Sequence, residues 1–306
     1  MIGDRGDRRA TVGRHVRWAA VVLVLFSVAG CVTAELDTNR AVPKHDYSFF
    51  VAGHAYGVPG TDNPGLHPPF RSAVPAIREQ GAEFGILTGD IVWSATAADW
   101  EDVDRDLRSL EIPVHFAVGN HDMNDRALFV SRYGPTYYSF RHKEDLFIIL
   151  DGEFDPCRIS GEQMVFLTDT LRESDDARYI FVFVHRLLWV VEGTPYLVLQ
   201  SKMNTTDGYD FRGNFWSEVV PALRALDAPV YVFAGDVGVP WAQSLFYERD
   251  GNIHLVASGM GGSEEENYLS VKVGPEEVVI EARRLDGHPL QRQDITAYDL
   301  DYYRGL

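Results

Sequence analysis

Short apolar runs recur along the chain and are separated by segments with a helical pattern. The runs are rich in aliphatic and aromatic side chains, and each is followed by a Gly or a His. Length and composition of this kind are typical of buried strands. The strands predicted in this way cover residues 47–52, 84–88, 114–118, 179–184 and 230–234.

Helical periodicity fills most of the intervals between these strands. In residues 97–110, large apolar side chains recur on one face of a helix. Ser160 begins another helix, and Gln163 follows it at the spacing of a capping box. Two further helical segments end at Gln80 and Leu226. A hairpin and three late strands complete the pattern, at residues 137–140 with 146–150, 253–258, 268–273 and 277–282.

The alternation of strands and helices predicts an α/β fold. No internal repeat or linker interrupts residues 47–298, so we expect one domain there and a C-terminal tail at 299–306. In such folds, ligands bind in the crevice beyond the carboxyl ends of the strands. The chemistry of this chain is therefore expected in the residues that follow its strands.

The N-terminus has the layout of a secretory signal peptide. Five Arg residues precede an apolar run, 18–28, that is too short to span a bilayer comfortably. Residues 28–31, Val-Ala-Gly-Cys, then resemble the bacterial lipobox. We expect residues 1–30 to be removed, Cys31 to carry lipid and residues 31–46 to form a tether. The protein would then be exported and anchored to a bacterial membrane, facing the periplasm or the exterior. An ordinary signal peptide, or a membrane anchor with an incidental Cys, is the alternative.

The composition argues against one class of partner. The 306 residues have a formal net charge of −17 and lack the clustered Lys and Arg of a nucleic-acid-binding domain. An acidic surface also repels phosphate groups. A phosphate-bearing substrate would therefore require a metal ion or a local basic patch.

Side chains that could bind a metal ion follow the predicted strands. His54, Asp90, Asn120, His185 and Asp236 each come directly after an apolar run or after the Gly that closes one. Gly permits a sharp turn that directs the next side chain into the crevice. Carboxylate, amide and imidazole donors together suit Mn, Zn or Fe. The alternative for the Asp and Asn residues is a turn or helix cap, and for the His residues a structural role.

The order of these motifs resembles that of the calcineurin-like metallophosphoesterases. The resemblance rests on Gly119-Asn120-His121-Asp122 after a strand, with a strand ending in Gly89-Asp90 before it and a strand ending in His185 after it. It implies a four-layer α/β/β/α sandwich, a phosphate-ester substrate and one or two divalent ions per chain, Mn, Zn or Fe.

The resemblance also implies roles for individual residues. Asp90 corresponds to the carboxylate that bridges two metal ions, Asn120 to an amide ligand and His185 to an imidazole ligand. His121 corresponds to the residue that stabilises or protonates the leaving oxygen, and Asp122 to the carboxylate that orients it.

Two motifs depart from the family pattern. Residues 53–56 read Gly-His-Ala-Tyr where the family has Gly-Asp-x-His, and residues 235–238 read Gly-Asp-Val-Gly where it has Gly-His-x-His. One metal site would keep its ligands as Asp90, Asn120, His185 and Asp236. The other would keep Asp90, gain His54 and lose two imidazoles, with Tyr56 as a replacement only in its phenolate form.

Two hypotheses for function follow. The first is a metal-dependent phosphoric ester hydrolase of the cell envelope with a rearranged or reduced metal site. The second is a catalytically inactive protein of the same fold that binds an envelope polysaccharide, a nucleotide or a protein. Aromatic residues near the loop ends would stack on sugars in that case: Tyr56, Trp93, Trp189, Trp216 and Trp241. Residues 264–266, three Glu, are expected to form a solvated acidic loop, with a cation or a sugar as its alternative ligand.

Overall fold

The computed structural model describes residues 46–306 except 62, 64, 203–207, 240–242 and 293. The predicted signal peptide, Cys31 and all but the last residue of the predicted tether lie outside these residues. None of the helices in the described part is long and apolar enough to cross a membrane. The described residues all belong to one compact unit.

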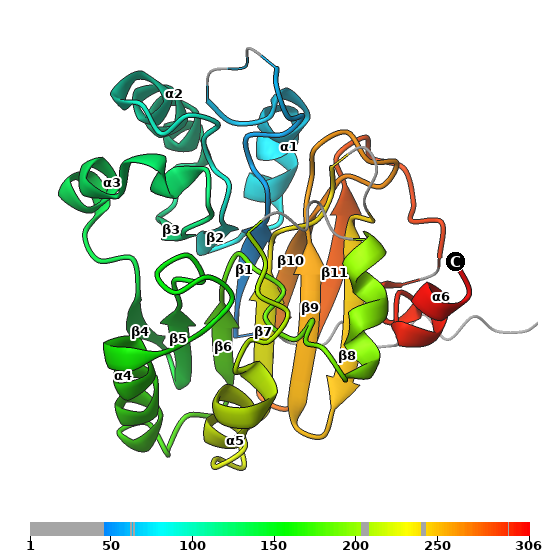
Figure 1. Cartoon of the computed structure of the whole chain (residues 1–306). Helices are drawn as coiled ribbons and strands as arrows, with labels where there is room; N and C mark the ends of the chain where they lie inside the picture. Colours follow the sequence, from blue (N-terminus) through cyan, green and yellow to red (C-terminus); the bar gives the residue numbers. More distant parts are fainter. Residues whose placement is uncertain (1–45, 62, 64, 203–207, 240–242, 293) are drawn as a thin grey trace, which may run out of the picture. The chain divides into compact units, whose positions relative to one another are not determined.

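Two mixed sheets form the centre of this unit (Figure 1). The first has the strand order β11-β10-β1-β2-β3, and the second has the order β4-β5-β6-β7-β9-β8. Strands β1 to β3 pair in parallel, as do β5, β6, β7 and β9, whereas β4, β8, β10 and β11 pair antiparallel. The strands are β1 (Tyr47–Ala52), β2 (Phe84–Thr88), β3 (Val114–Ala117), β4 (Tyr138–His142), β5 (Asp145–Ile149), β6 (Ile180–Phe183), β7 (Val230–Ala234), β8 (Leu245–Asp250), β9 (Ile253–Ser258), β10 (Asn267–Val273) and β11 (Val278–Arg284).

Helices cover the outer faces of the two sheets (Figure 1). They are α1 (Pro68–Glu79), α2 (Ala97–Leu107), α3 (Arg126–Tyr133), α4 (Gly161–Arg172), α5 (Val220–Leu223) and α6 (Leu300–Arg304). Short helical turns are η1 (Arg108–Leu110), η2 (Asp122–Asp125), η3 (Pro195–Lys202), η4 (Phe215–Val219) and η5 (Ile295–Ala297).

Side chains of β1 connect the layers, because successive residues of a strand point to opposite faces. Phe49 packs against Phe147 and Phe181 of the second sheet, with ring centroids 5.4 and 5.3 Å apart. Its neighbour Phe50 points to the other face and lies 6.0 Å from Phe70 of α1. One core therefore lies between the sheets and another between the first sheet and α1, α2 and α3. This confirms the four-layer α/β/β/α sandwich.

The strands predicted from the apolar runs are all present, with ends shifted by at most two residues. Strand β8 is an additional one. The predicted helix at 215–226 is a π-helical turn, η4, followed by the short α5. Residues 299–306, predicted as a tail, contain α6, whose Leu300 and Tyr303 are buried, and Tyr303 packs on Phe246 of β8.

The capping box predicted at Ser160 does not form. The Ser160 hydroxyl donates to Asp155 at 2.6 Å, and no side-chain hydrogen bond caps α4. Gln163 instead accepts from the backbone N–H of Asp151 at 2.7 Å and donates to its carbonyl oxygen at 3.0 Å. These backbone groups are buried just after β5, so the amide side chain satisfies polar groups that would otherwise lack partners.

Candidate metal centre

Glycines allow the ends of four strands to meet at one point. A Cβ at Gly235 would lie 1.9 Å from the carbonyl oxygen of Thr88, and one at Gly53 would lie 2.3 Å from that of Ser258. Only Gly permits backbones to approach so closely. The loops after β1, β2, β7 and β9 are thereby brought together, and those after β1, β2 and β7 are among the loops that the sequence pattern predicts to converge.

His54 and Asp90 are buried in these loops in a conformation that non-Gly residues rarely adopt. Their φ angles are 56° and 52°, in the left-handed region. Backbone hydrogen bonds hold the two loops together: His54 N–H donates to Gly89 at 3.0 Å, and Tyr56 N–H donates to Asp90 at 3.0 Å. Strained residues of this kind cluster at functional sites, where the surrounding structure fixes their direction.

Four of the predicted ligands lie at separations expected for atoms that share a metal ion. Nε2 of His185 is 3.4 Å from Oδ1 of Asp90 and 3.7 Å from Oδ1 of Asp236. Nε2 of His54 is 3.6 Å from Oδ2 of Asp90. Two ligands bound tetrahedrally at about 2.1 Å from one ion are about 3.4 Å apart. The observed pairs thus match the spacing of ligands better than that of hydrogen bonds.

Several of these donor atoms are buried and make no hydrogen bond within the described part of the chain. They are Oδ2 of Asp90, Oδ1 of Asn120, Nε2 of His185 and Oδ1 of Asp236. Buried polar atoms nearly always have a partner, so each exception requires an explanation. Nδ1 of His185 donates to the carbonyl oxygen of Thr88 at 2.9 Å, which leaves Nε2 as the ligating atom of a neutral ring. The unpaired atoms are those that a metal ion would bind.

The charges of the centre stabilise a cation. Burial opposes the ionisation of Asp90, but His185 and His54 hold the pKa of this carboxyl well below its usual range. Burial also opposes the protonation of His185, but Asp90 and Asp236 raise its pKa to about 10. For His54, burial prevails and lowers the pKa to about 4. The two carboxylates therefore favour a positive charge beside Nε2 of His185, supplied by either a proton or a metal ion.

The side chain of Asp236 is shared with a buried cluster that sequence patterns did not reveal. Its Oδ2 accepts a hydrogen bond from Tyr209 at 2.8 Å and lies 3.4 Å from the guanidinium of Arg186. Arg186 also donates to both carboxylate oxygens of Glu153, at 2.6 and 3.0 Å. Within the described residues, no three His, Cys, Asp and Glu side chains converge as a complete metal site, so the separations of His185 from Asp90 and Asp236 suit pairs of ligands but do not form a finished centre. The only sequence signal for the cluster is that Arg186 directly follows His185.

His121 and Asp122 make different contacts from those expected. Nδ1 of His121 donates to the carbonyl oxygen of Trp93 at 2.8 Å. Asp122 accepts three backbone N–H bonds at 2.8, 3.1 and 2.8 Å, two of them from the residues after Asp90. Burial and the neighbouring Asp90 raise the pKa of Asp122 to about 7. Asp122 therefore anchors the loop that carries Asp90, and the Trp93 carbonyl orients the imidazole.

Comparison with known proteins supplies the family. The profile of the family described as calcineurin-like phosphoesterase matches residues 45–259, which is more than half of the chain. The chain belongs to this family. No curated protein matches the sequence. Membership implies phosphate esters as substrates and divalent metal ions as cofactors.

Solved structures agree with the fold of a calcineurin-like phosphoesterase. A dimetal phosphatase from Danio rerio superposes with a TM-score of 0.58 at 13% identity, over 83% of this chain and 100% of that one. A purple acid phosphatase from yellow lupin (Lupinus luteus) seeds superposes with a TM-score of 0.57 at 12% identity, over 80% of this chain and 52% of that one. At such identities, the likeness shows the fold alone.

Apart from Asp236, this calcineurin-like phosphoesterase lacks a family His at two positions, and one of them is closed by backbone. Gly238 has a φ of 98°, in the region that favours Gly. A Cβ there would lie 2.4 Å from both the carbonyl carbon of Gly259 and the nitrogen of Met260. An imidazole could not be restored at this position without moving the loop after β9.

The other position is occupied by a buried phenol. The ring of Tyr56 lies 4.3 Å from that of His54 and 5.0 Å from that of His121. Burial, together with the charges of Asp90 and Asp236, raises the pKa of Tyr56, so the phenol is neutral. Tyr56 would become the phenolate ligand that the sequence left open only if a bound cation offset this effect on its pKa.

The remaining aromatic candidates divide between the core and the surface. Trp189 is fully buried, and the partly buried Trp216 donates to its carbonyl oxygen at 2.8 Å, so both support the fold. Trp241 lies outside the described residues. Trp93, at 39% exposure, is the one that faces solvent beside a candidate site residue.

The expectation of a solvated acidic loop at 264–266 is wrong for two of its three residues. Glu265 is buried and accepts a hydrogen bond from Tyr298 at 2.7 Å. Glu266 contacts His67 at 2.8 Å and accepts from the N–H of Gly261 at 2.9 Å. Both carboxylates thus hold the loop after β9 rather than meeting solvent.

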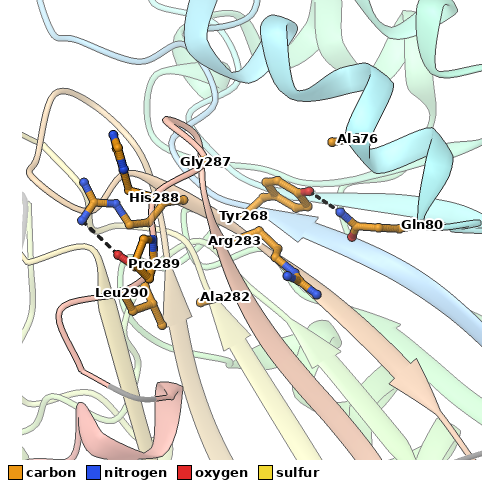
Figure 2. Close-up of a pocket in the computed structure, with 10 residues that line it drawn as sticks. Ala76, Gln80, Tyr268, Ala282, Arg283, Gly287, His288, Pro289 and Leu290 are labelled. Atoms are coloured by element: carbon orange, nitrogen blue, oxygen red, sulfur yellow. Dashed lines mark hydrogen bonds between the residues drawn. The ribbon is translucent and has the colours of Figure 1, made fainter. Parts of the chain in front are cut away.

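A separate groove of about 490 Å³ lies between α1, β10 and the turn after β11 (Figure 2). Figure 2 shows Gln80 donating to Tyr268, at 2.6 Å, on one side of it. Its two Arg residues are paired, Arg283 with Glu281 and Arg284 with Asp286. None of the candidate metal or catalytic residues lines this groove.

Proposed function

We propose that this chain is a metal-dependent phosphoric ester hydrolase with a reduced centre that binds one divalent ion. Asp90, Asn120, His185 and Asp236 would hold the ion, with His54 beside it. The observation that carries the proposal is that each of the first four side chains keeps a buried donor atom without a hydrogen-bond partner in the described structure.

The residues at positions 56 and 238 favour the binding of one metal ion over the binding of two. The backbone of Gly259 and Met260 leaves no space for a side chain at Gly238. The neutral phenol of Tyr56 packs on His54 where a second imidazole would be needed. A second ion would have Asp90 and His54 as its only ligands from this set, which is fewer than divalent transition-metal sites usually have.

The chain's own residues would bind the substrate and transfer a proton. A bound Mn, Zn or Fe ion polarises phosphoryl oxygens and lowers the pKa of water. His121, held through Nδ1 by the Trp93 carbonyl, keeps Nε2 available to protonate the leaving oxygen. Asp122 fixes the loop after Asp90, so that ligand and acid keep a constant separation.

Metal content is the first test of this proposal. We expect purified full-length protein to contain about one ion per chain by elemental analysis, and Asp90→Ala to lose both the ion and the hydrolysis of p-nitrophenyl phosphate. Asp176→Ala serves as the control, because Asp176 is exposed and pairs with Arg141 at the surface. Two ions per chain would show that His54 and Tyr56 rebuild the second site. Absence of bound metal after incubation with Mn, Zn and Fe would overturn the proposed hydrolase activity.

We further propose that the hydrolase acts in the cell envelope as a lipid-anchored protein. The support is the sequence before the domain, in which a basic segment, an apolar run and Cys31 follow in order. Fractionation of expressing cells tests it: the full-length protein should enter the membrane fraction, and Cys31→Ala should not carry lipid. An Ala variant that still incorporates labelled fatty acid would contradict the anchor.

The alternative is an inactive protein that binds a ligand in the same crevice. It is favoured by the contact of Arg186 with Asp236, since this cation already neutralises a candidate metal ligand. Calorimetric titration with Mn²⁺ separates the two proposals. Binding that is lost in Asp90→Ala supports the hydrolase, whereas no binding together with retention of a polysaccharide or nucleotide supports the alternative.

A further inference from the structure

Trp93 is exposed beside the candidate acid, although it is one of the largest apolar side chains in the protein. It is 39% exposed, whereas Trp100 and Trp189 are fully buried. Its indole stacks on the imidazole of His121, with centroids 4.4 Å apart and planes inclined by 26°. An exposed aromatic surface next to a catalytic group indicates a binding role more than a packing role.

The position of this indole is fixed from two sides. The carbonyl oxygen of Trp93 accepts the hydrogen bond from His121, and the two preceding residues donate their backbone N–H groups to Asp122 at 2.8 and 3.1 Å. The ring of Tyr56, which is buried, meets the indole edge-on at 5.2 Å. A rigid aromatic surface loses little conformational entropy when a ligand packs on it.

We propose that Trp93 is a specificity-determining residue that stacks on a ring in the leaving group of the substrate. The inference rests on the proposed hydrolase activity, in which His121 protonates the leaving oxygen. The leaving oxygen then lies beside His121, and the indole of Trp93 is 4.4 Å from the imidazole ring. A ring joined directly, or through one carbon, to the ester oxygen would reach the indole. The preferred substrates are therefore phosphate esters of phenols, nucleosides or sugars, which each carry a ring within one carbon of the ester oxygen, rather than esters of short-chain alcohols.

Binding of non-hydrolysable phosphonates tests the inference without a catalytic readout. Full-length protein loaded with Mn²⁺ is titrated calorimetrically with methylphosphonate, phenylphosphonate and a glucosyl C-phosphonate. We expect at least one ring-bearing probe to bind about tenfold more tightly than methylphosphonate. Trp93→Ala should remove this preference and leave the affinity for methylphosphonate unchanged, and Trp93→Phe should retain part of it. The phenyl and glucosyl arms distinguish an aromatic ring from a sugar ring.

Phe154→Ala is the matched control, because Phe154 is an aromatic residue with 61% exposure whose ring faces Arg126. It should leave the preference intact. Equal affinities of the three probes for the unsubstituted protein would overturn the role of Trp93 and leave the hydrolase standing. A loss of methylphosphonate binding in Trp93→Ala would also overturn it, since the residue would then act by holding His121. Failure of every phosphonate to bind the metal-loaded protein would instead count against the hydrolase itself.

Discussion

The guanidinium of Arg186 lies 3.4 Å from Oδ2 of Asp236, and both side chains are buried. Asp236 stands where the family has a His, and His54 stands where it has an Asp, so the two exchanges keep one carboxylate but place it beside Arg186. Arg186 offsets that charge, and its second partner Glu153 is also buried. A carboxylate ligand and its counter-cation thus take the place of one neutral imidazole.

Removal of this cation should destabilise the fold. In Arg186→Gln, Glu153 and Asp236 would remain buried without their partner, which typically costs about 3–5 kcal/mol. Urea unfolding in the presence of EDTA measures the change in the free energy of unfolding. Arg212→Gln is the control, because Arg212 is 79% exposed and its pair with Asp210 should contribute about 0–1 kcal/mol. Similar losses in both variants would show that Arg186 is not a structural counter-ion.

Tyr209 should tune metal affinity through Asp236. Its hydroxyl donates to Oδ2 of Asp236 at 2.8 Å, which leaves Oδ1 for the ion. In Tyr209→Phe, we expect the affinity for Mn²⁺ to fall about 10- to 100-fold, as is usual when a partner of a ligand is removed. Competition with a fluorescent chelator measures it. Tyr137→Phe removes the hydroxyl of a ring that packs on Phe166. This variant should bind Mn²⁺ with the affinity of the unsubstituted protein.

Gly235 should tolerate no side chain. In Gly235→Ala, the new Cβ would lie 1.9 Å from the carbonyl oxygen of Thr88, which is held in β2 by pairing with Ala117 of β3. We expect a loss of about 3 kcal/mol or more in the free energy of unfolding, or failure to fold. Gly305→Ala is the control, since the nearest atom to its Cβ would be 3.5 Å away. A stable Gly235→Ala protein would mean that the backbone after β7 does not approach Thr88 of β2 closely enough to exclude a methyl group.

His254 should make the fold less stable in mild acid. Burial, with a smaller effect of Arg249, lowers the pKa of His254 to about 4, and its ring also contacts Tyr231 and Tyr247. The unfolded chain binds a proton near the ordinary pKa of about 6.5, so this contribution to stability is present above that pH and is lost progressively as the pH falls toward 4.

A pH comparison with His254→Gln isolates this effect. Between about pH 7.5 and pH 5, the unsubstituted protein should lose about 1–2 kcal/mol more than the variant, after allowance for the partial exposure of the ring. Urea unfolding at the two pH values supplies the four free energies. Equal losses in the two proteins would show that His254 titrates normally in the folded state.

Parts of the candidate centre were predictable from the sequence because they depend on local pattern. An apolar run followed by Gly and a polar residue specifies a buried strand that ends in a sharp turn. His54, Asp90 and Asp236 follow such turns, and the structure brings Asp90 and Asp236 close to His185 and His54 close to Asp90. The order of the motifs also sufficed for the family, which the match over residues 45–259 confirms.

The contacts that set the chemistry were decided only by the tertiary structure. Arg186 and Asp236 are 50 residues apart, and His121 and Trp93 are 28 apart, so no periodicity or local spacing connects them. The expected role of Asp122 gave way because buried N–H groups of the loop after Asp90 required an acceptor. Likewise, whether another residue could replace Gly238 depends on the backbone of Gly259, which follows β9. The sequence by itself determined which residues stand at the ends of the strands. The packing of the loops determined which atoms of those residues remain free to bind.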